Sequence, residues 1–178
     1  MTQRRITRRQ AYVMTDRRIL VAGLGNELLM DDGVGVHAVR ALTQSRRFRP
    51  RESIRCLEVG TAVLDAVEDV AWAEHVLLLD AVQAGGSPGS CCFVAGNLEP
   101  RNSRGGLHEL SLVGTIGLLG PSHVAPTMSL IGIEPECIEY GLELSLTVAR
   151  TLSTMVDYAL VHLEQLRKRH SGDNYRNY

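Results

Sequence analysis

Aromatic residues, paired cysteines and long apolar runs are all scarce in this sequence. Aromatics make up 4% of the 178 residues, which disfavours a surface that stacks nucleic-acid bases. None of the four cysteines forms a C-x-x-C pair, so we expect free thiols and no zinc site. No apolar run reaches the roughly 20 residues that a membrane span needs. The formal net charge of −1 favours neither a nucleic-acid nor a membrane partner.

The ends of the chain differ in composition from its middle. The first residues are rich in arginine and lack the apolar centre of a secretory signal. We therefore expect a disordered arginine-rich tail over 1–17, a single α/β domain of the hydrolase type over 18–170, and a polar tail over 171–178. Because free thiols persist in a reducing compartment, we also expect a cytoplasmic protein.

Between the tails, short apolar runs alternate with amphipathic stretches. Strands are predicted at 18–22, 54–59, 75–81, 90–95 and 128–133. Helices are predicted at 32–43, about 62–72, 110–119, and in a last segment whose apolar stripe is Val148, Leu152, Met155, Ala159, Leu163 and Leu166. This alternation is typical of the α/β class: a three-layer fold with a twisted, mostly parallel five-stranded sheet and helices on both faces. Right-handed crossovers then place the first and third strands side by side.

The most informative stretch is 19–36, which reads ILVAGLGNELLMDDGVGV. It predicts a strand, a glycine turn, an acidic corner and a helix, and ligands of open α/β sheets bind at the carboxyl ends of the strands. Gly23 and Gly25 could begin a dinucleotide fingerprint, but Leu28 stands where the third glycine belongs. No Walker lysine follows, which excludes a P-loop.

Carboxylates follow two of the predicted strands. Asp31 or Asp32 could simply cap a helix, whereas Asp80 follows a continuous apolar strand and needs a partner or a wet pocket. Among six histidines, His108 opens a predicted helix beside a polar loop, and His123 is the next candidate. Two carboxylates and one imidazole can hold a first-row divalent metal that polarises a carbonyl. The residues alone thus indicate a possible metal-assisted hydrolase.

The sequence from about 18 to 166 resembles the hydrogenase maturation endopeptidases, which process the large subunit of nickel–iron hydrogenases. The motifs that carry the resemblance occur in the family's order. They are GLGNELLMDDGVG from Gly23, Gly60-Thr61, Asp80-Ala81, His108-Glu109-Leu110 and Gly132-Ile133-Glu134-Pro135. The resemblance implies an α/β fold and an aspartyl-type endopeptidase activity.

The resemblance also implies a site. The family's metal-contacting positions correspond to Asp32, Asp80 and His108, with Asp31 as an alternative for the first. The implied partner is the large-subunit precursor, whose C-terminal extension is removed after nickel insertion, so the nickel belongs to the precursor. The Gly60-Thr61 turn and the loops over 83–106 are candidates for holding the peptide. The alternatives are another metal-dependent amide hydrolase and a chaperone that binds the nickel-loaded subunit without cutting it.

Overall fold

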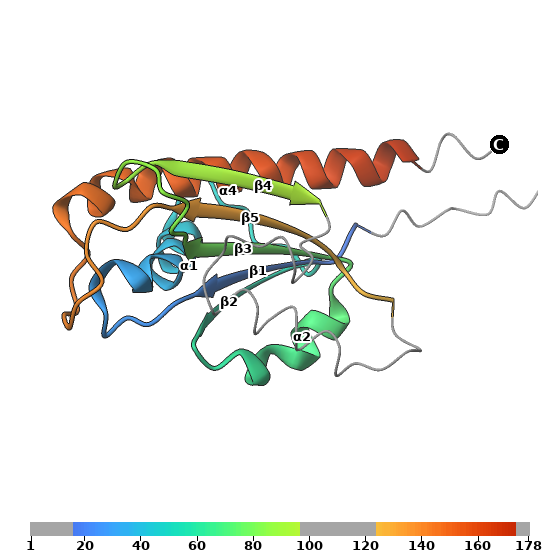
Figure 1. Ribbon diagram of the computed structural model, residues 1–178. Helices are drawn as coiled ribbons and strands as arrows, with labels where there is room; N and C mark the ends of the chain where they lie inside the picture. The colour runs from blue at the N-terminus through green and yellow to red at the C-terminus, as the bar shows by residue number, and fades with distance from the viewer. Residues whose placement is uncertain (1–15, 97–123, 174–178) are drawn as a thin grey trace, which may run out of the picture.

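The computed structural model describes residues 16–96 and 124–173. Their centre is a twisted sheet of five strands in the order β2-β1-β3-β5-β4 (Figure 1). The strands are β1 (Ile19–Leu24), β2 (Ile54–Gly60), β3 (His75–Ala81), β4 (Cys91–Gly96) and β5 (Thr127–Ile133). The predicted neighbourhood of the first and third strands is confirmed, because β1 pairs with β3 in parallel.

Helices cover both faces of the sheet, as the alternation predicted. They are η1 (Met30–Gly33), α1 (Val34–Gln44), η2 (Val63–Ala66), α2 (Val67–Trp72) and α4 (Leu146–Asp173). One apolar cluster joins α1 and α4 to one face, and a second joins η2 and α2 to the other. Figure 1 shows α4 running along the length of the sheet, with α2 on the opposite side. The helix expected at 110–119 lies outside the described residues.

Strands β1 and β3 form the buried centre of the sheet. Every residue of both strands is buried, as expected for parallel strands covered on both faces. Alternate side chains point to opposite faces, so Leu77 and Leu79 pack with α1 and α4 while Val76 and Leu78 pack with α2. Both strands point their carboxyl ends to the same edge of the sheet.

The long helix α4 follows the predicted stripe. Five of its six members are buried, and Leu152 is partly buried against the same cluster. Because α4 begins at the carboxyl edge of the sheet and ends at the opposite edge, it lies close to both ends of the fold (Figure 1).

Strand β4 is the antiparallel member of the sheet. It pairs with β5, with Cys91 opposite Ile133 and Gly96 opposite Met128. The connection from β3, residues 82–90, contains no helix, and a parallel return needs a crossover of about a dozen residues or more. The short connection therefore reverses the chain direction.

All four cysteines are free thiols. Burial raises the pKa of Cys56 to about 11, which keeps this thiol protonated at neutral pH. No helix within 16–96 and 124–173 has both the length and the apolar character that a bilayer crossing requires.

A buried polar network lies where β3 and β5 begin. The ring nitrogens of His75 are hydrogen-bonded to Thr127 Oγ1 at 2.6 Å and to Ser129 Oγ at 2.8 Å. Ser129 Oγ is in turn 2.9 Å from His162 Nε2 on α4, and Arg17 donates to Thr127 Oγ1 at 2.6 Å. Burial, helped by the charges of Arg17 and His162, lowers the pKa of His75 to about 3. The fold therefore keeps this imidazole neutral.

We predict that His75 makes folding stability fall in acid. In the unfolded chain its pKa is about 6.5, so protons bind the unfolded state preferentially as the pH falls from about 6.5 towards 3. Each pH unit in this window costs up to about 1.4 kcal/mol. Urea unfolding at pH 7, 6, 5 and 4 should therefore give a shallower decline for His75→Gln than for the wild type. Parallel declines would show that His75 does not titrate this way.

Candidate functional site

The glycine turn after β1 wraps closely around Asp32. Gly25 has a φ of +110°, and a Cβ on it would lie 1.8 Å from the backbone oxygen of Asp32. Its N–H donates to Gly60 O at 3.2 Å, which joins this turn to the one that follows β2. The N–H of Asn26 donates to Asp32 Oδ2 at 2.8 Å. The half-buried Asp32 carboxylate is therefore held at the turn and caps no helix.

The start of α1 is packed directly on the ends of β1 and β3. A Cβ on Gly35 would lie 2.1 Å from Leu79 O and 2.5 Å from Leu24 O, so only glycine allows this approach. Leu79 is followed by Asp80, and Gly35 lies three residues after Asp32. Asp32 and Asp80 consequently lie at the carboxyl ends of adjacent parallel strands.

Asp80 is an almost completely buried carboxylate. It is 1% exposed, and its Oδ1 accepts the N–H of Ala81 at 2.8 Å. The two predicted imidazole candidates, His108 and His123, lie outside the described residues. Within the described ranges, no three His, Cys, Asp or Glu side chains are grouped closely enough to hold a metal ion. The described part of the candidate site is thus two aspartates, Asp32 and Asp80, at one sheet edge.

Asp31, the alternative first ligand, has a different role. It is 0% exposed, and its carboxylate accepts three backbone N–H groups. These come from Glu136 at 2.9 Å, Cys137 at 3.0 Å and Ser145 at 2.7 Å. Successive residues of the η1 turn point in different directions, so Asp31 faces the 136–145 loop while Asp32 faces the glycine turn. Asp31 is therefore a structural carboxylate that holds a loop.

Glu134 is a second structural carboxylate, which the sequence analysis named only as part of the Gly132-Ile133-Glu134-Pro135 motif and gave no role. Its side chain accepts N–H groups from Ala84 at 2.8 Å, Gly85 at 3.3 Å and Gly86 at 3.1 Å. It thereby fixes the loop that follows Asp80. In the sequence, this interaction could have been indicated by an acid at the end of β5 and a glycine pair after β3. The two lie close together only because β3 pairs with β5.

Ion pairs hold the outer side of the corner. The guanidinium of Arg40 on α1 donates to Glu27 at 2.9 Å and to Glu58 on β2 at 2.6 Å. These two hydrogen bonds raise the pKa of Arg40 above its usual range. His37 Nε2 lies 3.8 Å from the same Glu27 carboxylate. Arg40 thus connects the residues after the glycine turn to the end of β2.

Exposed apolar side chains border the acidic corner. Met30 has a φ of +47°, which is unusual for a side chain of its size. Its N–H donates to Gly141 O, and Gly141 N–H donates to Leu28 O, both at 3.0 Å. This bridge brings together Leu28, Tyr140 and Leu142, which are 59%, 92% and 68% exposed. We call these three residues the apolar rim.

The fold and the sequence match one family of proteins. A family model described as hydrogenase maturation protease matches residues 36–162. The chain is 32% identical over 157 residues to the hydrogenase expression/formation protein HoxM of Azotobacter vinelandii, covering 85% of this chain and 75% of that protein. It is 30% identical over 152 residues to the hydrogenase 2 maturation protease of Escherichia coli, covering 83% and 92%.

Solved structures agree with these matches. The hydrogenase maturating endopeptidase HybD of E. coli superposes with a TM-score of 0.74 at 28% identity, covering 83% of this chain and 93% of that one. The [NiFe] hydrogenase maturation protease HybD of Thermococcus kodakarensis gives 0.67 at 27% identity, covering 84% and 99%. The family model, these relatives and these structures together place the chain in the class of peptide-bond hydrolases. The chain belongs to the hydrogenase maturation protease family, and it is an endopeptidase.

The two adjacent aspartates should differ sharply in their effect on folding. Asp31→Asn places an amide NH₂ or a single acceptor opposite three buried N–H donors, and we expect a loss of about 2–4 kcal/mol in the free energy of unfolding. Asp32→Asn keeps an oxygen for the N–H of Asn26, so we expect a loss below about 1 kcal/mol. Urea unfolding of both variants measures the difference. Equal losses would contradict the structural role of Asp31.

Proposed function

We propose that this endopeptidase removes the C-terminal extension of a nickel–iron hydrogenase large-subunit precursor after nickel insertion. The observation that carries the proposal is the placement of Asp32 and Asp80 at the carboxyl ends of adjacent strands in a member of this family. The printed names of the relatives describe hydrogenase maturation, and one solved structure is titled a [NiFe] hydrogenase maturation protease. These names support a hydrogenase as the substrate.

In this proposal the precursor's nickel is the recognition element. Asp32, Asp80 and His108 contact it through two carboxylates and one imidazole, a donor set that suits a divalent first-row metal. Contact with the nickel places the nearby scissile peptide bond at the sheet edge. The nucleophile is supplied by one carboxylate or by a water that the nickel polarises. The imidazole must be neutral to bind a metal, so recognition weakens below about pH 6.5.

The structural carboxylates support this division of roles. Asp31 holds the 136–145 loop and Glu134 holds the loop at 84–86, so both loops next to the aspartate pair are fixed in place. A preformed edge of this kind allows a substrate group to bind without first ordering the loops. The apolar rim continues from this edge, and we assign it to the precursor's polypeptide.

We predict that Asp32→Asn, Asp80→Asn and His108→Ala each abolish processing of the nickel-loaded precursor. Removal of a charge or of the imidazole weakens the contact with nickel, so the measured mass of the precursor should stay unchanged after incubation. Glu52→Gln, an exposed acid at the opposite edge, is the matched control and should process normally. Normal processing by His108→Ala would remove this residue from the site.

We further predict that Tyr140→Ser and Leu142→Ser weaken binding of the precursor without unfolding the protein. Both side chains are exposed in the structure, so their loss costs little stability, whereas each apolar contact with the precursor is worth about tenfold in KM. Tyr158→Ser, which removes an exposed tyrosine from the middle of α4, is the control. An unchanged KM in both rim variants would exclude the rim from precursor binding.

A further inference from the structure

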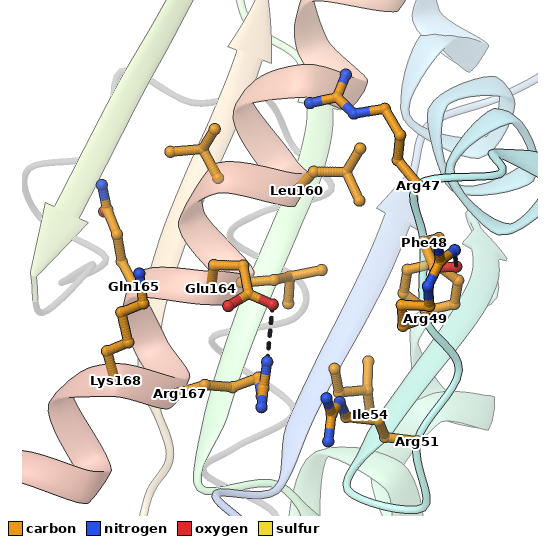
Figure 2. Close-up of a pocket in the computed structure, with 12 residues that line it drawn as sticks. Arg47, Phe48, Arg49, Arg51, Ile54, Leu160, Glu164, Gln165, Arg167 and Lys168 are labelled. Atoms are coloured by element: carbon orange, nitrogen blue, oxygen red, sulfur yellow. Dashed lines mark hydrogen bonds and ion pairs between the residues drawn. The ribbon is translucent and has the colours of Figure 1, made fainter.

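A basic groove lies at the edge of the sheet opposite Asp32 and Asp80. It is a cavity of about 460 Å³ between the 47–51 loop, the start of β2 and the last turns of α4 (Figure 2). The first residue of β2, Ile54, pairs with the first residue of β1. The groove is therefore separated from the aspartate pair by the length of the strands.

Cations occupy both sides of the groove. The loop side carries Arg47, Arg49 and Arg51, and the helix side carries Arg167 and Lys168 (Figure 2). Three carboxylates of the chain form ion pairs with some of these cations.

Each of these carboxylates forms one ion pair with an arginine. Glu164 binds Arg167 at 2.7 Å, Asp16 binds Arg51 at 3.5 Å, and Asp157 pairs with Arg47. Five cations and three carboxylates leave two positive charges in excess, in a chain whose formal net charge is −1. Among the described residues, this groove therefore carries a net positive charge.

The floor of the groove is apolar. Phe48, Ile54, Leu160 and Leu163 line it below the charged side chains, and Val161 lines it while being 51% exposed. A ligand that fits must therefore combine negative charge at its edges with apolar groups that reach the floor. An apolar side chain that enters the groove gains by leaving water.

The arrangement of the cations favours a peptide over a nucleic acid or a membrane. The cations are spread along two sides rather than directed at one point (Figure 2), which does not suit a single phosphate. Phe48 is 9% exposed and packs with the core, so it presents no ring for base stacking. The apolar residues lie at the bottom of a hollow, where a flat bilayer surface does not reach them.

We propose that this groove binds an acidic segment of a partner protein, with carboxylates on the two basic sides and apolar side chains on the floor. Charge complementarity brings the segment to the groove, and the accessible side chains of Leu160 and Val161 bind its apolar residues. This surface is separate from the aspartate pair and does not depend on the proposed peptidase substrate.

The test uses the full chain and a fluorescein-labelled 12-residue peptide of alternating Glu and Leu. Fluorescence anisotropy should show binding that weakens with salt. The double variant Arg49→Glu/Lys168→Glu, with one change on each side, should weaken binding by about tenfold or more. Val161→Ser should weaken it by about threefold while leaving the charge unchanged. Arg150→Glu, an exposed arginine near the start of α4, should bind the peptide as the wild type does.

Competing probes decide whether the ligand is an acidic peptide. A Gln/Leu peptide tests the need for charge, a Glu/Ser peptide tests the need for apolar groups, and both should bind at least about tenfold more weakly. Equal binding of the Glu/Ser peptide, or tighter binding of inorganic polyphosphate or of phosphatidylglycerol vesicles, would overturn the proposal. So would equal loss of binding in Arg150→Glu and in the groove variant.

Discussion

The close backbone contact between the start of α1 and the end of β3 governs the geometry of this protein. Gly35 brings the helix within reach of Leu79 O, and a single methyl group there would meet backbone atoms on two strands. Backbone cannot shift as a flexible side chain can, so the contact sets the distance between the acidic turn and the strand end. Asp32 and Asp80 owe their common position to this contact and to the β1–β3 pairing.

Neighbouring acids in the site have opposite tasks. The carboxylates of Asp31 and Glu134 accept hydrogen bonds from backbone N–H groups, and each fixes a loop beside the sheet edge. Asp32 and Asp80 are instead placed where the strands end. The loops on either side of Asp32 and Asp80 are therefore held by buried or partly buried carboxylate hydrogen bonds.

The two edges of the sheet present different surfaces. The carboxyl edge combines aspartates with the apolar rim, whereas the opposite edge concentrates arginine and lysine around an apolar hollow. Helix α4 extends from one edge to the other and contributes side chains to both the core and the basic groove.

Much of the fold and the position of the acidic corner could be predicted from the sequence, because the patterns responsible for them are local. The continuous apolar run within 75–81 predicted β3, the three- and four-residue spacing predicted α4, and the glycines before Asp31-Asp32 marked the corner. The antiparallel direction of β4 was not predicted, although the short 82–90 connection carried the reason. The sequence could not separate the tasks of Asp31 and Asp32, which are adjacent and chemically identical. Only tertiary structure decides between them, because the donors that bind Asp31 come from residues more than a hundred positions away.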